Sequence, residues 1–100
     1  MEIEMQIAEF QDIISRTWLE RDRARGLDAT FMWLMEEVGE LAAALREGTP
    51  SDQQHEFGDV LAWLFTVANV AGVDLERAAK RYRSGCPTCG AMPCTCSGKP

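Results

Sequence analysis

Apolar side chains recur every three or four residues along the first 85 residues, which is the period of an α-helix that buries one face. The pattern predicts helices over about Glu2–Arg25 and Ala29–Glu47, a third from the turn "GTPS" to about Ala71 and, more briefly, one over residues 75–83. The residues that form the apolar stripes of the first three helices are Ile3, Ile7, Phe10, Ile14 and Trp18; Phe31, Leu34, Val38, Leu41 and Leu45; and Phe57, Leu61, Leu64 and Ala68.

Glycine and capping residues separate these segments. Gly26, Gly48 and Gly72 each follow the last periodic position of a helix, where glycine is common as a C-terminal cap. Residues with short polar side chains stand near each expected start and are preferred N-caps. The candidates are Asp28 or Thr30 for the second helix, Thr49 followed by Pro50 or else Ser51 with Gln54 for the third, and Asp74 for the fourth.

The pattern contains no strand signal and no repeat of solenoid length, so an all-α fold is expected. We predict one all-α domain over residues 1–85 and a small Cys-rich tail over residues 86–100. Ile13, Val60 and Val67 lie off the main stripes and would expose a second apolar face. A helical hairpin core is therefore expected, which becomes a four-helix-type bundle when a homodimer or homotetramer forms.

The composition narrows the classes of partner. The 100 residues carry a net charge of −6, which disfavours nucleic acid and anionic membranes as main partners. No apolar run approaches the roughly 20 residues of a membrane span. The start "MEIEMQIAEF" lacks the basic region of a secretory signal, so a cytoplasmic location is expected.

Acidic residues gather in two stretches, "EEVGE" from Glu36 and "EFGD" from Glu56. At about 100° per residue, Glu37 and Glu40 share a helix face with Trp33, beside the apolar stripe. The next helix places a second acidic pair and a tryptophan together in the same way. These residues are Glu56, Asp59 and Trp63.

A short turn at Gly48 makes the second and third helices antiparallel neighbours, so residues whose numbers add up to 96 lie at equal heights. The matching pairs are Glu40 with Glu56, Glu37 with Asp59, and Trp33 with Trp63. Four carboxylates in a partly buried seam either take up protons or bind a cation. All-oxygen ligands favour Mg²⁺ or Mn²⁺ over Ca²⁺, and the alternative is a solvated acidic face.

A di-iron site is disfavoured, because such sites use Glu-x-x-His and the only histidine, His55, precedes Glu56. His55 is expected at the surface near the start of its helix.

The motif "EEVGE" followed by "EFGD" and "VLAWLFTVANVAGVDLERA" resembles the MazG-like nucleotide pyrophosphohydrolases over about residues 27–83. The resemblance implies an all-α, Mg²⁺-dependent enzyme that hydrolyses nucleoside triphosphates to the monophosphate and pyrophosphate, often to clear unwanted nucleotides. By motif position it implies metal ligation by the four seam carboxylates, and it implies that Glu36 holds a further ion or orients the attacking water. It also implies an oligomer. The implied ligands are Glu37, Glu40, Glu56 and Asp59.

A triphosphate also needs cations, and "RAAKRYR" offers Lys80, Arg81 and Arg83 at the end of the fourth helix. They are either phosphate ligands or solvated charges that favour a helix C-terminus. The resembled family tends to carry Lys, Asn and Arg after this helix, whereas here "KRYR" runs into "SGCPTCG". Arginines of the first helix are possible substitutes, in part from a partner subunit. These are Arg16, Arg23 and Arg25.

The tryptophans beside the acidic layers have two interpretations. Trp33 and Trp63 could stack on a nucleobase, or they could fill an oligomer interface. We favour the interface for Trp63 and leave both open for Trp33.

All four cysteines lie in the tail "CPTCGAMPCTC": Cys86, Cys89, Cys94 and Cys96. The C-x-x-C pair followed by C-x-C favours structural Zn²⁺, then free or redox-sensitive thiols, then disulfides.

The sequence therefore supports two hypotheses about function. The first is Mg²⁺-dependent hydrolysis of nucleoside triphosphates or deoxynucleoside triphosphates. The alternative is a non-enzymatic dimeric helical adaptor whose zinc-binding tail recognises a protein partner.

Overall fold

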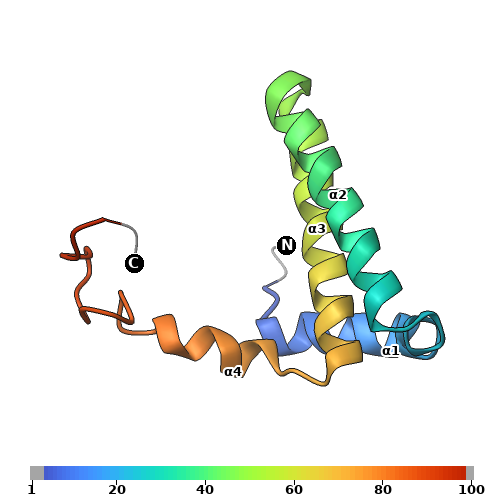
Figure 1. Cartoon of the computed structure of the whole chain (residues 1–100), viewed down its shortest axis with the longest axis horizontal. Coiled ribbons are helices and arrows are strands. Elements are labelled where there is room, and N and C mark those ends of the chain that lie inside the picture. Colours follow the sequence, from blue (N-terminus) through green and yellow to red (C-terminus); the bar gives the residue numbers. More distant parts are fainter. Residues whose placement is uncertain (1–3, 99–100) are drawn as a thin grey trace.

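The computed structural model describes residues 4–98, and within this range the chain is all-α, as predicted. The helices are α1 (Ile7–Arg25), α2 (Leu27–Glu47), α3 (Pro50–Ala71) and α4 (Leu75–Ala79), followed by the 3-10 helix η1 (Lys80–Tyr82). Figure 1 shows α2 and α3 as a long antiparallel hairpin, with α1 crossing its base. α4 and the C-terminal tail extend away from the hairpin.

The turn between α2 and α3 is closed by a capping box. Thr49 Oγ1 accepts a hydrogen bond from Asp52 N at 3.1 Å, and Asp52 Oδ2 accepts one from Thr49 N at 3.0 Å. Pro50 is the first helical residue. Of the two predicted caps Thr49 is therefore correct, and the alternative cap Ser51 with Gln54 is wrong.

The predicted starts of the first two helices are wrong. α1 begins at Ile7, and residues 4–6 before it are not helical. The residue before the helix, Gln6, makes no side-chain capping hydrogen bond. Glu2 and Ile3 lie outside the described residues. α2 begins at Leu27, directly after Gly26, whose φ of 93° lets the chain turn from one helix into the next. Asp28 and Thr30 are therefore inside α2 rather than caps, and Thr30 Oγ1 donates to Gly26 O at 2.6 Å.

The end of the helical region follows the prediction more closely. Gly72 ends α3 in the left-handed conformation, with φ 75°. Asp74 caps α4 by accepting a hydrogen bond from Arg77 N at 3.1 Å. The predicted fourth helix is split, because its last turn tightens into η1.

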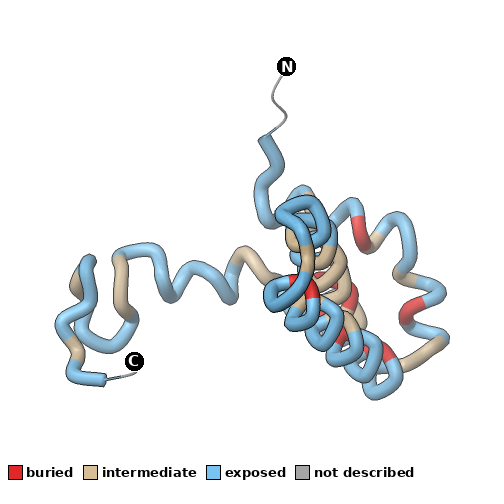
Figure 2. The backbone as a smooth tube through the Cα atoms, turned by 90° about the horizontal axis from the view of Figure 1, so that it is seen from above, coloured by how far each residue is buried: buried red, intermediate tan, exposed pale blue. Residues whose placement is uncertain are grey.

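The core of a single chain is small. Its buried apolar side chains are Ile14, Leu34, Ala44, Phe65 and Ala68. Phe10 of α1 meets Phe65 of α3 edge to face, with ring centroids 4.8 Å apart. Figure 2 shows how few positions along the helices are buried. Most of the described residues of the predicted stripes remain 39% to 54% exposed, so these stripes are wrong as the core of one chain. The exposed ones are Ile7, Trp18, Phe31, Val38, Leu45, Phe57, Leu61 and Leu64.

Gln11 fastens α1 to the junction between α3 and α4. Its Nε2 donates to Asn69 Oδ1 at 3.0 Å and to Val73 O at 2.7 Å, and its Oε1 accepts from Leu75 N at 2.9 Å. These bonds set where α1 crosses α3, and the crossing in turn shapes the cavity described below.

Within the described range, no individual helix is both long and apolar enough to cross a membrane. α3 together with the segment Leu75–Tyr82 meets the length and composition criteria only as a pair bent by 111°.

Candidate metal and nucleotide site

The hairpin brings the acidic residues of α2 and α3 together in a carboxylate seam, comprising Glu37, Glu40, Glu56 and Asp59. One carboxylate oxygen from each of Glu37, Glu40 and Glu56 lies within 4.8 Å of the others. Asp59 forms a second such group with Glu56 and His55. The tryptophan layer is also present, because Trp33 and Trp63 stack with centroids 6.2 Å apart and planes 21° apart. Acidic residues and tryptophans of α2 therefore lie opposite those of α3, as expected from a turn at Gly48.

The seam is electrostatically strained, because carboxylates of like charge converge in it. Burial raises the pKa of Glu37, and the hydrogen bond and charge of Glu40 and the charges of Asp59 and Glu56 add to the effect. Glu37 Oε2 and Glu56 Oε2 are buried without a hydrogen-bond partner among the described residues. Such orphaned carboxylate oxygens fit a hard divalent cation, which prefers oxygen ligands.

This strain predicts a pH effect on stability. The pKa of Glu37 is raised in the folded protein above its unfolded value of 4.5. Its contribution to the stability of the fold is therefore fully present below pH 4.5, and it is lost as the pH rises through the pKa of the folded state. With a chelator present at pH 8, we expect the Glu37→Gln variant to melt at a higher temperature than the unmodified chain. We expect this difference in melting temperature to become smaller as the pH is lowered towards 5. Thermal melts measure this. The exposed control Glu47→Gln should show no such trend; equal melting of Glu37→Gln and the unmodified chain at pH 8 would contradict it.

His55 is exposed, as predicted, but its contact with the seam was not foreseen. His55 Nε2 lies 3.3 Å from Asp59 Oδ2. The two residues are one helical turn apart, so the i, i+4 spacing was the available signal.

Glu36 lies apart from the seam. It is exposed, and it belongs to none of the groups of convergent ligands among the described residues. Its position about 100° around α2 from Glu37 explains this separation. Its role in orienting water remains a prediction.

A cavity of about 320 Å³ adjoins the seam and shares Asp59 with it. α1 and α3 form its walls, and two arginines bring positive charge beside the carboxylates. The lining residues are Trp18, Arg21, Asp22, Arg25, Asp59, Ala62, Trp63 and Thr66.

Arg25 organises this cavity. Its Nη1 lies 3.1 Å from Asp22 Oδ1 and donates to Thr30 Oγ1 at 3.3 Å, while its guanidinium carbon is 5.1 Å from the centre of the Trp63 ring. The Asp22 side chain is only 4% exposed, and its Oδ2 has no hydrogen-bond partner in the described part of the chain. The cavity thus combines a cation, an unused acceptor and an aromatic face.

Arg25 was among the predicted substitutes for phosphate binding, whereas Arg21 and Asp22 were missed. Trp18, Arg21 and Arg25 share one face of α1, since they are three and four residues apart. That spacing was the signal for the missed arginine.

The cations predicted at the end of the fourth helix lie elsewhere. Lys80 and Arg81 belong to η1 and Arg83 follows it; all three are exposed, and none lines the cavity beside the seam. Arg81 stacks on Tyr82, with its guanidinium carbon 5.0 Å from the ring centre. Within one chain the structure does not bring these residues to the carboxylates.

Comparison with known protein families gives a match. The family model for the MazG nucleotide pyrophosphohydrolase domain matches residues 25–84, which include all of α2, α3 and α4 and therefore the four acids. Most of α1 and the Cys-rich tail lie outside the match. No curated protein matches the sequence closely enough to count as a relative.

Proposed function

The chain belongs to the MazG nucleotide pyrophosphohydrolase family, and from this premise we propose that it hydrolyses nucleoside or deoxynucleoside triphosphates to the monophosphate and pyrophosphate. The observation that carries the proposal is the seam, in which Glu37 Oε2 and Glu56 Oε2 are buried without partners. Clearing unwanted nucleotides is the cellular role that this chemistry suits.

We assign Mg²⁺, or Mn²⁺ in its place, to the carboxylate seam. Glu37, Glu40, Glu56 and Asp59 are the proposed ligands, because their oxygens converge from two facing helices. A divalent ion bound there supplies charge stabilisation at the phosphates and a bound water of lowered pKa. Glu36 keeps its proposed role of orienting the attacking water.

The cavity beside the seam is the proposed place for the rest of the substrate. Arg21 and Arg25 offer guanidinium groups, which suit phosphate oxygens because they donate two parallel hydrogen bonds. Trp63 lines the same cavity and offers a stacking surface for a base, supported on one side by Trp33. Lys80, Arg81 and Arg83 would bind the phosphates only at the site of another subunit.

We also propose that the chain acts as a homodimer or homotetramer. One chain exposes 7706 Å², whereas a compact protein of 11.2 kDa exposes roughly 5,700 Å². At about 100° per residue, the exposed apolar residues of α2 share one face of their helix, beside the acidic face, and those of α3 do the same. They are Phe31, Val38, Leu45, Phe57, Leu61 and Leu64. Light scattering tests this, and a monomeric mass at micromolar concentration would contradict it.

The activity is tested with a panel of nucleoside triphosphates, deoxynucleoside triphosphates and modified nucleotides. We expect release of pyrophosphate and the monophosphate, dependent on Mg²⁺ or Mn²⁺ and abolished by chelator. Release of orthophosphate instead would contradict cleavage between the α- and β-phosphates. If no nucleotide is cleaved and the seam binds no divalent ion even with nucleotide present, the enzymatic proposal fails and the adaptor hypothesis replaces it.

A further inference from the structure

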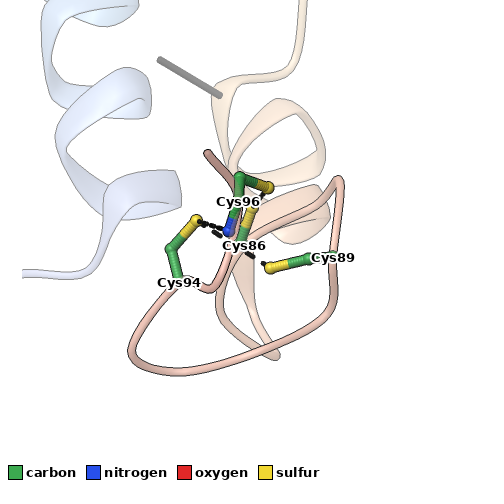
Figure 3. A group of neighbouring side chains, drawn as sticks. All are labelled: Cys86, Cys89, Cys94 and Cys96. Carbon is green, nitrogen blue, oxygen red and sulfur yellow. Dashed lines mark hydrogen bonds between the residues drawn. The ribbon is translucent and has the colours of Figure 1, made fainter. Parts of the chain in front are cut away.

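The C-terminal tail gathers all four cysteines at a place separate from the seam. Figure 3 shows Cys86, Cys89, Cys94 and Cys96 turned toward one another from a looped segment that follows η1. None of them lines the cavity beside the carboxylates, and all lie beyond residue 84, where the family match ends. The cluster therefore needs an explanation of its own.

The sulfur separations match those of a metal tetrahedron. The Sγ atoms of Cys86 and Cys96 are 3.7 Å apart, and those of Cys89 and Cys94 are 3.8 Å apart. All four Sγ atoms lie within 4.8 Å of one another. A Zn–S bond of about 2.3 Å in a regular tetrahedron requires sulfur atoms about 3.8 Å apart, whereas a disulfide holds them at about 2.05 Å.

The loop backbone holds the first pair of cysteines in a tight turn. Cys86 O accepts a hydrogen bond from Gly90 N at 2.7 Å, and Cys86 N donates to Ala91 O at 3.0 Å. Gly90 has φ 74°, and Gly85 has φ 109° with no room for a Cβ, which would lie 2.8 Å from Ala91 O. These glycines allow the chain to fold Cys86 and Cys89 toward the same point.

Backbone N–H groups also point at the sulfur atoms. Thr95 N donates to Cys89 Sγ at 3.4 Å, and Cys96 N donates to Cys94 Sγ at 3.3 Å. Hydrogen bonds of this kind stabilise sulfur that carries negative charge, as thiolate ligands of a metal do.

The tail has no apolar core that could hold this arrangement. Within 85–98 no residue is buried and Met92 is 74% exposed. Ordering each residue costs about 1–2 kcal/mol of conformational entropy, and apolar burial does not offset that here. A cross-link or a metal ion is the usual source of order in so small a segment.

We propose that Cys86, Cys89, Cys94 and Cys96 bind one Zn²⁺ in a closed four-thiolate site that orders the tail. All four ligand positions belong to the protein, so the ion is structural and leaves no position for a substrate or water. Each protonated thiol releases its proton to solvent on binding, which makes the affinity fall at low pH.

The test is the metal content of the full chain, purified without added chelator and dialysed against Mg²⁺ buffer. We expect about one zinc per chain. Cobalt loaded in its place should give the intense visible absorption of tetrahedral cobalt thiolate. Cys89→Ser and Cys94→Ser should each lower zinc at least tenfold, while the neighbouring control Ser97→Ala keeps it.

The outcomes separate this site from the proposed enzyme. Zinc content should be unchanged in Glu40→Gln, since that residue belongs to the seam alone. To avoid dependence on the folding of variants, the unmodified chain is also stripped of zinc and digested with a protease. We expect cleavage within residues 86–97 to accelerate at least tenfold while the helices stay intact. Four free thiols without zinc, two disulfides, or unchanged cleavage after stripping would each overturn the proposal.

Discussion

Changing Glu40 to Gln together with Asp59 to Asn is expected to lower the rate of pyrophosphate release by roughly 100-fold or more. The two oxygens lost come from opposite helices, so the seam would retain acids on each side but no longer surround an ion. Amide oxygens bind divalent cations more weakly than carboxylates because they carry no net charge. Both side chains keep their size, so the helix content should stay unchanged.

The measurement combines steady-state kinetics with a titration of the divalent ion. We expect the apparent Mg²⁺ affinity to fall with the rate and high Mg²⁺ to restore only part of the activity. Glu47→Gln is the matched control, because Glu47 is exposed on the same helix outside the seam. Full activity in the double variant would show that the ligands had been assigned wrongly.

Replacing Arg25 with Met is expected to lower the free energy of unfolding by about 3 kcal/mol. Arg25 is the partner of Asp22, whose side chain is 4% exposed and already has one oxygen without a hydrogen bond. Removing the guanidinium leaves a buried carboxylate with no compensating charge. The methionine preserves most of the packing against Trp63, so the loss reports charge more than volume.

Denaturant unfolding without nucleotide measures this effect apart from any role in substrate binding. Arg23→Met is the control, since Arg23 is exposed on the same helix. Adding Asp22→Asn to Arg25→Met should recover much of the lost stability, because no buried charge then remains. If Arg25→Met is as stable as Arg23→Met, the pair of Arg25 and Asp22 does not contribute to the stability of the fold.

The hairpin was predictable because its determinants are local. Glycine and threonine at residues 48 and 49 set the turn, and a constant rotation per residue then places Glu37 and Glu40 opposite Glu56 and Asp59. The stacked tryptophans lie where the same arithmetic puts them. The sequence left Thr49 and Ser51 open as caps of α3, and the capping box formed by Thr49 and Asp52 decides for Thr49.

The cavity was not predictable, because it depends on where α1 crosses α3. That crossing is set by Gln11, whose partners lie 58 to 64 residues away, so no local pattern reveals it. In the sequence Asp22 does not differ from the other acidic residues, whereas in the structure it is buried where α1 crosses α3. The exposure of the apolar stripes of α2 and α3 was not predictable for a similar reason. Periodicity identifies an apolar helix face, but it does not identify what packs against that face.

The tryptophans and the tyrosine occupy different parts of the molecule, and this has a practical consequence. All three tryptophans gather around the cavity: Trp18 and Trp63 line it, and Trp33 stacks on Trp63. The single tyrosine, Tyr82, stands beside the cysteine-bearing loop. Indole emission can therefore follow ligand entry into the cavity in an unlabelled sample. Metal loading of the tail should leave that emission nearly unchanged, because no tryptophan belongs to the tail.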